Sequence, residues 1–452
     1  MPTITGTEGT DVLSGGADAD TILGLGGNDF LTGNEGNDVI DGGSGDDTIT
    51  GSSGADILTG GSGVDVFRDK AAGLNGDRIT DFLPGDRIQI TDLNIQTATI
   101  GLNGSTITFN GNSLTVDNLG PGRLVVRGMQ EGGVEIRLQG VAHNDFDGDG
   151  ISDFMWRDAS GTMSEWTGTK SGGFQWNSST SFAVGNDWTM LGFGDFTGDG
   201  HNDILWRQTS TGMVQEWASI DNGGAGSFAW KVDYNLPTTQ QFQTIGDFNG
   251  DGRQDVMWRT TDGTLSEWLG QVGGGFQWNP YSAFNVTNDW KVIGSGDFNN
   301  DGHDDLLWRQ DNSGIVMEWL GNDQGSFAWN VNFDLPTSYH LVGTGDFNSD
   351  GVSDIMWRNS DGRLSEWLGQ GNGGFQWNPN ASFAVSNDWQ AAGIGDYNGD
   401  GLDDIMWQTS TGHVYQWLGQ LNGNVSTFAW NQAVQYDVGT NFHAQPPSDH
   451  FL

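Results

Sequence analysis

Large apolar residues recur at every ninth position near the start of the chain. Seven consecutive nine-residue units run from Gly6 to Arg68 without an insertion, and their eighth positions are Leu13, Ile22, Leu31, Ile40, Ile49, Leu58 and Phe67. The positions between them are mostly Gly, Asn, Ser, Thr and Asp, which favour turns. The pattern predicts a stack of coils, each a short strand and a turn, whose apolar side chains fill a narrow interior between two parallel sheets.

The sixth position of each unit is always aspartate: Asp11, Asp20, Asp29, Asp38, Asp47, Asp56 and Asp65. Glycine permits positive φ in the turns and leaves backbone carbonyls pointing inward. Calcium prefers about six to eight hard oxygen ligands, which stacked carbonyls and aspartates can supply. The seven units resemble the RTX (hemolysin-type) calcium-binding repeat, which implies a parallel β-roll that binds calcium in its turns.

Residues 69–144 lose the nine-residue period but keep short alternating stretches such as TATIGLNGSTITFN and VEIRLQG. Such alternation is typical of strands, so we expect these stretches to continue and cap the roll. The segment Asp77–Ile90, DRITDFLPGDRIQI, resembles the region that follows the RTX repeats in serralysin-type proteins. We therefore assign residues 1–144 to a calcium β-roll with capping strands.

A second repeat begins at Asp145, where a loop of the form D-x-[DNT]-x-D-G-x-x-D first occurs and then recurs five times at intervals of 49 to 52 residues. Each interval contains four strand-like stretches, which is the content of one propeller blade. The repeats resemble the FG-GAP/VCBS repeats of integrin α-subunits and fungal-lectin propellers. The predicted fold is therefore all-β, with a six-bladed calcium-binding β-propeller over residues 145–452.

The six repeats fall into two alternating types. Repeats one, three and five contain SEW, GGFQWN and NDW, whereas repeats two, four and six contain FAW and lack NDW. The unit is thus a pair of blades used three times. Because an open ring would expose a sheet edge, we expect residues 436–449, which align with residues 234–247 and 333–346 before the third and fifth loops, to complete blade one.

Each of the six loops carries an oxygen-bearing side chain at its first, third, fifth and ninth positions, with a carbonyl near the seventh. The loops resemble the first part of an EF-hand loop, although strand-like segments flank them and no Glu stands at position twelve. Thr197 departs from the Asp or Asn at position three, so the second site is expected to be weaker. The predicted ligands are Asp145, Asp147, Asp149, Asp153, Asp195, Thr197, Asp199, Asp203, Asp247, Asn249, Asp251, Asp255, Asp297, Asn299, Asp301, Asp305, Asp346, Asn348, Asp350, Asp354, Asp396, Asn398, Asp400 and Asp404.

The charge of the chain agrees with a fold built around cations. Asp and Glu number 59 against 17 Lys and Arg, a formal net charge of −42, and the chain contains no Cys. Nucleic-acid binding is disfavoured because it requires a basic face. We expect calcium to replace disulfides as the element that holds the fold, and the chain to be largely unfolded where calcium is scarce.

Export is expected by a route without a cleavable signal. The first residues, MPTITGTEGT, lack the basic and apolar regions of a signal peptide, and no stretch is apolar enough to span a bilayer. The last residues, SDHFL, resemble the uncleaved C-terminal signal of type I secretion substrates. This resemblance implies a secreted bacterial protein that acts outside the cell or on its surface.

Motifs for catalysis are missing from the sequence. It contains no HExxH, GxSxG or P-loop, and its seven His are scattered. His201 and His303 stand at the seventh position of calcium loops, and their side chains are expected at the surface. The sequence therefore predicts a protein that is not an enzyme.

Tryptophan is used systematically, with all 21 Trp beyond residue 144. The first Trp of each repeat, usually in a Trp-Arg pair, is expected in the core. A sugar site commonly combines an aromatic plane with polar groups. The SEW and GGFQWN segments offer such candidates, although blade-to-blade packing is the more common role for any single Trp: Glu165, Trp166, Gln175, Trp176, Glu267, Trp268, Gln277, Trp278, Glu366, Trp367, Gln376 and Trp377.

Three functions follow from these features. The favoured one is multivalent, lectin-like recognition of an extracellular glycan or cell-surface polysaccharide, or adhesion through it, by a calcium-binding secreted protein. The first alternative is a structural surface-layer or biofilm-matrix protein that associates with its own kind in calcium. The second is an accessory module of an extracellular enzyme, whose catalytic part is another chain.

Overall fold

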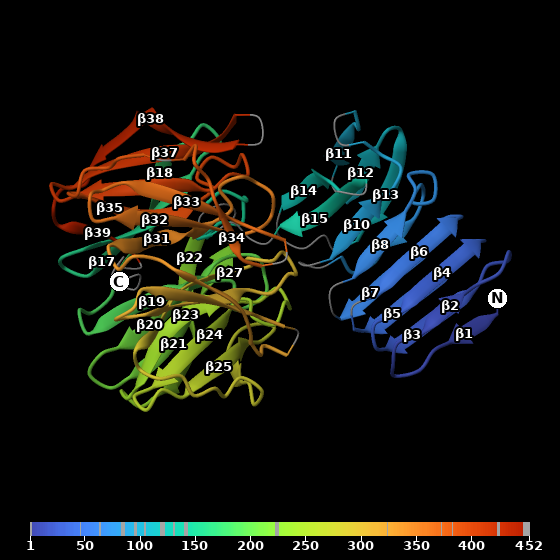
Figure 1. Ribbon diagram of the computed structural model, residues 1–452, viewed down its shortest axis with the longest axis horizontal. Helices are drawn as coiled ribbons and strands as arrows, with labels where there is room; N and C mark the ends of the chain where they lie inside the picture. Colours follow the sequence, from blue (N-terminus) through green and yellow to red (C-terminus); the bar gives the residue numbers. More distant parts are fainter. Residues whose placement is uncertain are drawn as a thin grey trace. The chain divides into compact units, whose positions relative to one another are not determined.

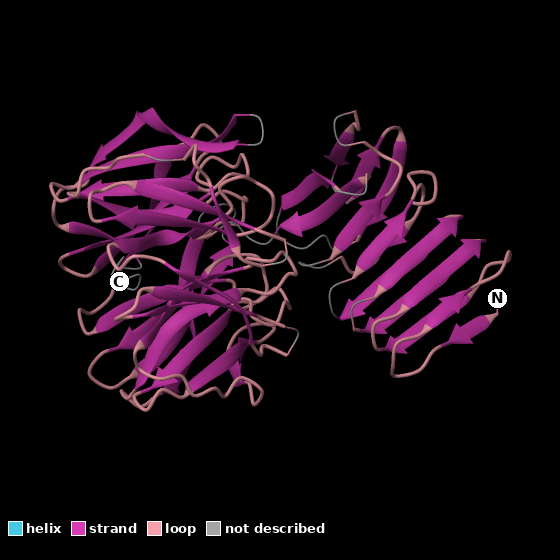
Figure 2. Ribbon diagram, viewed as in Figure 1, coloured by secondary structure: helices cyan, strands magenta, loops and turns pink. Residues whose placement is uncertain are grey.

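The computed structural model describes residues 2–45, 47–62, 65–82, 86–94, 97–103, 105–117, 123–129, 132–139, 143–221, 226–322, 324–371, 373–381, 383–422 and 425–445. In these ranges the chain forms strands β1 to β39 and no helix (Figure 2). A helix long and apolar enough to cross a membrane is accordingly not found in the described part of the chain. The fold divides into two compact units, the first containing Met1–Gly140 and the second Val141–Asn249 and Arg253–Leu452.

The first unit is a roll of two sheets whose strands alternate along the chain (Figure 1). One sheet contains, in spatial order, β1 (Thr3–Thr5), β3 (Thr21–Gly26), β5 (Val39–Ser44), β7 (Ile57–Ser62), β9 (Arg78–Ile79), β13 (Asn112–Val116), β12 (Thr106–Phe109) and β11 (Ile100–Asn103). The other contains β14 (Arg123–Gly128), β15 (Val134–Gln139), β10 (Arg87–Ile90), β8 (Val66–Asp69), β6 (Thr48–Ser53), β4 (Phe30–Glu35) and β2 (Val12–Ser14).

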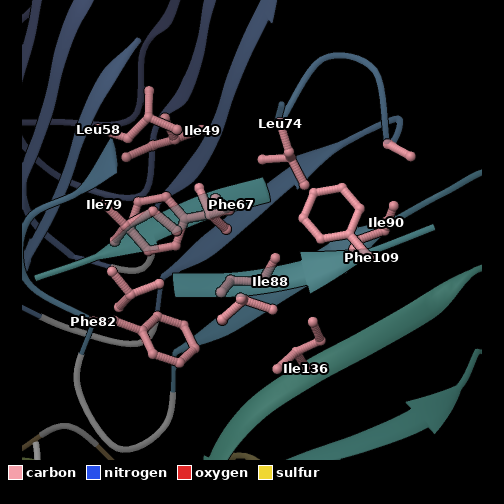
Figure 3. Packing of buried hydrophobic residues seen from close by; sticks show 14 of the residues in the cluster. Ile49, Leu58, Phe67, Leu74, Ile79, Phe82, Ile88, Ile90, Phe109 and Ile136 are labelled. Atoms are coloured by element: carbon pink, nitrogen blue, oxygen red, sulfur yellow. The ribbon is translucent and has the colours of Figure 1, made fainter. Parts of the chain in front are cut away.

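Parallel pairing joins the coils of the roll, as the nine-residue period predicts. Each strand pairs with the strand two coils later, so Ile22 lies opposite Ile40 and Ile40 opposite Leu58. The eighth-position residues from Ile22 to Phe67 are at most 1% exposed and form one core with Ile79, Phe82 and Ile88 (Figure 3). Antiparallel hairpins, β11–β12–β13 and β14–β15, follow these coils and pair with them.

The second unit is a six-bladed propeller of four-stranded antiparallel sheets. Blades one to three contain β39 (Phe442–Gln445), β16 (Phe154–Asp158), β17 (Thr162–Gly168) and β18 (Phe174–Ala183); β19 (Trp188–Gly194), β20 (Asp203–Gln208), β21 (Met213–Asp221) and β22 (Gly226–Asn235); and β23 (Gln240–Gly246), β24 (Asp255–Thr260), β25 (Leu265–Gly270) and β26 (Phe276–Trp278).

Blades four to six follow the same order. They contain β27 (Trp290–Gly296), β28 (Asp305–Gln310), β29 (Ile315–Leu320) and β30 (Ala328–Asp334); β31 (Tyr339–Gly345), β32 (Asp354–Asn359), β33 (Leu364–Gly369) and β34 (Phe375–Trp377); and β35 (Trp389–Gly395), β36 (Asp404–Thr409), β37 (His413–Asn422) and β38 (Val425–Asp437). The fold class is thus all-β, a parallel roll and a six-bladed propeller, as the sequence predicts.

The inner strands contact one another in turn from β19 through β23, β27, β31 and β35 to β39. Blade one therefore takes its inner strand from the end of the unit and its other three strands from the beginning. Strand β39 pairs antiparallel with β16, with Phe442 opposite Asp158 and Gln445 opposite Met155. Residues 446–449 of the predicted closing segment lie outside the described residues.

Neighbouring blades are joined by the Trp-Arg pairs. The six Trp of these strands are at most 1% exposed, which confirms the core position predicted for them: Trp156, Trp206, Trp258, Trp308, Trp357 and Trp407. The Arg of each pair lies over the Trp of the next blade, with 5.4 to 6.0 Å between the guanidinium carbon and the ring centroid. In blade six, Gln408 replaces this Arg, and its amide donates to the carbonyl of Phe442 in β39.

Candidate calcium centres and tryptophan rim

The six propeller loops share one backbone conformation, set by the first aspartate. In the first loop, Asp145 Oδ1 accepts the amide of Gly148 at 2.7 Å and Oδ2 accepts that of Gly150 at 2.8 Å. These two residues have φ of 74° and 81°, in the left-handed region where glycine carries no steric cost. Asn300 and Ser349 adopt the same region at the fourth position of loops four and five. The loop therefore folds around the first carboxylate.

Carboxylates crowd together in the first propeller loop, and neighbouring carboxylates also repel one another in loops two, four, five and six. In the first loop, oxygens of Asp145, Asp147 and Asp149 all lie within 4.8 Å of one another. Burial, together with the neighbouring carboxylates, raises the pKa of Asp145 to about 7, and the same causes raise that of Asp346 to about 8 and that of Asp404 to about 9. Buried like charges at this spacing repel one another, and hard oxygens are the ligands that Ca²⁺ prefers. The loops fit calcium.

The aspartate at the ninth position is buried behind the loop. Asp153 Oδ2 accepts the amide of Phe146 and Oδ1 accepts that of Gly168, both at 2.8 Å. Equivalent pairs of bonds hold the ninth residues of the other five loops. These side chains are at most 1% exposed, so they anchor the loop to the third strand of the blade and bring charge to the cluster: Asp153, Asp203, Asp255, Asp305, Asp354 and Asp404.

Three further residues of the loops are Thr197, His303 and His201. Thr197 is 5% exposed, and its hydroxyl donates to Asp195 Oδ1 at 3.4 Å, so the second loop has one carboxylate fewer than the first. The surface position expected for His303 is wrong. Its side chain is 5% exposed, because its Nδ1 lies 3.1 Å from Asp301 Oδ1 and its Cβ packs beside Gly321, after the third strand of the same blade. His201 is half-buried, 3.3 Å from the carbonyl of Phe146.

The roll has a second set of candidate ligands, the sixth-position aspartates. Except for the half-buried Asp11, they are at most 2% exposed. Oδ1 of each later aspartate accepts the backbone amide of the aspartate eighteen residues earlier, as in the bond from Asp20 to Asp38 at 2.8 Å. This row of bonds, the aspartate ladder, holds the carboxylates one above another along the stack.

The second oxygen of the ladder carboxylates faces the turns. Oδ2 of Asp29 and of Asp38 is buried and has no hydrogen-bond partner. A Cβ built on Gly24 would lie 2.4 Å from Asp29 Oδ2 and 2.3 Å from the carbonyl oxygen of Gly42, so only glycine fits there. A buried carboxylate oxygen and a carbonyl oxygen converging on one point are what a hard cation needs, and the turns of the roll therefore fit calcium.

The structure separates the twelve candidate glycan-binding residues into three groups. The three glutamates of the SEW segments are fully buried: Glu165, Glu267 and Glu366. The three tryptophans of these segments are half-buried within blade cores: Trp166, Trp268 and Trp367. The Gln and Trp of the GGFQWN segments are exposed. The Glu side chains do not reach the surface, so they offer no contact to a ligand in solution. Surface contact is open to Gln175, Trp176, Gln277, Trp278, Gln376 and Trp377.

Two of the buried glutamates, Glu267 and Glu366, instead link neighbouring blades. Glu267 Oε2 accepts Asn279 Nδ2 at 2.7 Å, and the same Nδ2 donates to the carbonyl of Gln324 in blade four. Glu366 accepts the hydroxyl of Ser426, in blade six, at 2.8 Å. Glu366 thus has hydrogen-bond donors from two blades, and Glu267 is connected to blade four through Asn279; these bonds explain a carboxylate in the middle of a buried strand.

The outer strand of each blade presents one exposed tryptophan, and the six together form what we call the tryptophan rim. Each rim residue lies directly opposite a half-buried Trp on the neighbouring strand, as in the pairs Trp166–Trp176 and Trp268–Trp278. Three of them were missed as candidates because the even repeats lack the Gln. The exposed fractions are 60% for Trp176, 59% for Trp230, 55% for Trp278, 62% for Trp329, 56% for Trp377 and 48% for Trp430.

Comparison with known families identifies both units. Residues 3–31 and 32–67 match the RTX calcium-binding nonapeptide repeat, and residues 145–206, 247–308, 297–357 and 346–407 match the FG-GAP-like repeat. The chain therefore carries RTX repeats followed by FG-GAP-like repeats, and calcium is the cofactor of the former. The resemblance of Asp77–Ile90 to the serralysin-type flank stays a prediction.

Matches to individual proteins are distant. No curated protein matches the chain. Among solved structures, a protein from Lactobacillus plantarum is 10% identical with a TM-score of 0.37, over 64% of this chain and 86% of that one. AofleA from Arthrobotrys oligospora is 10% identical with a TM-score of 0.38, over 65% and 87%.

Proposed function

We propose that this chain, with RTX repeats and FG-GAP-like repeats in succession, is a secreted, non-catalytic protein that binds extracellular carbohydrate at several equivalent sites around its propeller. The observation that carries the proposal is the tryptophan rim. Soluble proteins seldom expose large aromatic side chains in a regular array without using them for binding. A half-exposed indole offers a flat apolar plane of the kind that stacks against a sugar ring.

The position of the rim favours many weak sites over one strong site. Each Trp stands on the outer strand of a different blade, so six exposed indoles are distributed around the ring. Successive residues of a strand point to opposite faces, so Gln175 and Trp176 lie on opposite faces of β18. The indole is therefore the main contact within each blade, and affinity for a repeated glycan comes from several blades engaging at once.

Secretion and calcium belong to the same proposal. RTX repeats are typical of secreted bacterial proteins, and calcium is abundant outside cells. The chain brings 59 acidic residues and no Cys. Bound calcium then holds the fold, and the propeller presents the rim only where calcium is present.

The experiment is a glycan array in millimolar calcium with the intact chain and three variants. The first variant replaces Trp176, Trp278 and Trp377 by Ala, and the second replaces Trp230, Trp329 and Trp430. Each triple variant is expected to lose most of the signal, because avidity falls steeply with the number of sites. The matched control is Tyr281→Ala, an exposed aromatic residue (65%) outside the rim, which should bind normally.

Full binding by both triple variants, with unchanged circular dichroism, would refute the rim as the binding surface. Absence of any glycan signal together with ordered assembly on addition of calcium, measured by light scattering, would favour the surface-layer or biofilm-matrix alternative. Pull-down of a catalytic chain from the culture medium of the producing cells would favour the accessory module.

A further inference from the structure

The aspartate ladder of the roll continues beyond the nonapeptides. Within the repeats, bonded aspartates are eighteen residues apart, whereas the next two bonds run from the amide of Asp56 to Asp77 Oδ1 and from that of Asp65 to Asp86 Oδ1, each at 2.9 Å over 21 residues. Strand β9 nevertheless pairs with β7 in the repeat register, with Leu58 opposite Ile79. The three additional residues are taken up in the turn before Asp77.

Asp77 has the burial and the free oxygen of a repeat aspartate. It is 1% exposed, and its Oδ2 is buried with no hydrogen-bond partner, as is Oδ2 of Asp56. Both oxygens face Gly51. A Cβ built there would lie 2.4 Å from Asp56 Oδ2 and 3.1 Å from Asp77 Oδ2. At Gly24, Gly33 and Gly42, by contrast, the second oxygen nearby is a glycine carbonyl.

A third carboxylate stands close to this point. Asp69 comes nine residues after Gly60, where a further repeat would have its first glycine. Asp69 Oδ2 accepts the amide of Ser52, the residue after Gly51, at 2.8 Å. Burial first, and then the charges of Asp56 and Asp69, raise the pKa of Asp77 to about 7.

We propose that Asp56 and Asp77 bind a calcium ion at Gly51, at the end of the nonapeptide stack, in a site of higher negative charge than those between repeats. A carboxylate oxygen from Asp77 takes the place of a neutral carbonyl, and Asp69 adds a nearby charge. Because ligand charge sets calcium affinity at a given geometry, this site fills before the repeat sites of the roll.

The test uses Asp77→Asn in the full chain. The amide oxygen of Asn still accepts the amide of Asp56, so the ladder bond is kept while the ligand charge is removed. Native mass spectrometry during calcium titration resolves each bound ion. The variant is expected to lose the earliest-filling ion of the roll, with that step about tenfold weaker. The matched control is Asp18→Asn, an exposed aspartate of the second repeat, which should titrate as the unaltered chain does.

Asp69→Asn provides an independent measurement if Asp77→Asn fails to fold in saturating calcium. It keeps an acceptor for Ser52 and is expected to weaken the same step by a smaller factor. Identical calcium counts and identical early binding steps in the folded variants and the unaltered chain would overturn the proposal. Glycan binding is a separate outcome, because it is assigned to the propeller.

Discussion

The backbone amide of Ser152 donates a hydrogen bond of 2.8 Å to the carbonyl oxygen of Asp396. Ser152 is the eighth residue of the first calcium loop, and Asp396 is the first residue of the sixth. The same contact joins each loop to the next around the propeller, and the six loops therefore form a closed ring: Asn202 to Asp145, Gln254 to Asp195, Asp304 to Asp247, Ser353 to Asp297 and Asp403 to Asp346.

The contacts between successive loops of this ring alternate between one and two hydrogen bonds. At three of them the side chain of the eighth residue also accepts the amide of the first, each at 2.8 Å: Asp145 to Asn202, Asp247 to Asp304 and Asp346 to Asp403. These three contacts lie between blades one and two, three and four, and five and six. The three blade pairs inferred from the sequence are thus the same pairs whose loops share two hydrogen bonds.

Asn202→Ala is expected to destabilise the propeller by about 1–3 kcal/mol, because it leaves the buried amide of Asp145 without its acceptor. Thermal unfolding in saturating calcium measures this as a lower Tm. Ser152→Ala is the matched control, since Ser152 occupies the same loop position, keeps its backbone bond and has an Oγ that is buried without a partner. An equal loss of stability in both variants would show that the side-chain bond contributes nothing.

The repeat periods in the sequence made the coils and the blades predictable. The features that could not be predicted depend on contacts between residues that are far apart in the chain. The apolar residue in every nine predicted the roll core, but an insertion of three residues concealed that Asp77 and Ile79 repeat the roles of Asp56 and Leu58. Parallel pairing restores the register there, and a search for a fixed period does not detect it.

The candidate glycan-binding residues show the same limit of prediction from the sequence. Glu267 and Trp278 stand in similar polar surroundings in the sequence, yet the first is fully buried and the second 55% exposed. Burial of Glu267 depends on Asn279 and on Gly325 of the following blade, about sixty residues away in the chain. The sequence does not show that these residues pack against Glu267, so the rim Trp could be proposed as ligand contacts from the sequence but the Glu could not be excluded.

Two tryptophans of blade three should differ sharply in their effect on stability. Trp258→Ala removes a side chain that is 1% exposed and covered by Arg207 at 5.4 Å, and is expected to cost about 3–5 kcal/mol. Trp278→Ala removes a rim residue and should cost less than about 1 kcal/mol. Urea denaturation in calcium measures both. A large loss from Trp278→Ala would mean that the rim belongs to the structural core.

Removal of residues 442–452 should lower the Tm of the propeller by about 10 °C or more. The deletion removes β39, and with it the inner-strand partner of β16 and the acceptor of the Gln408 amide. Blade one would then have an open edge. A chain that ends at residue 445 keeps β39 and serves as the control. Equal melting temperatures for the two truncated chains would refute closure by β39.

The calcium-free protein should become more stable on acidification. The pKa values of Asp77 and Asp145 are raised to about 7, and that of Asp346 to about 8, mainly by burial, whereas an unfolded Asp has its ordinary value near 3.8. The folded state therefore binds protons more tightly, so its stability is present at low pH and is lost as the pH rises through these values. In calcium the dependence of stability on pH has the opposite sign, because the ion requires the ionised carboxylates and protons compete with it.

Protein dialysed free of metal should thus show more β structure by circular dichroism at pH 5.5 than at pH 8, and calcium-loaded protein should melt at a higher temperature at pH 8. Loss of β structure on acidification of the metal-free protein would contradict the assignment of these buried carboxylates as a cation-dependent element of the fold.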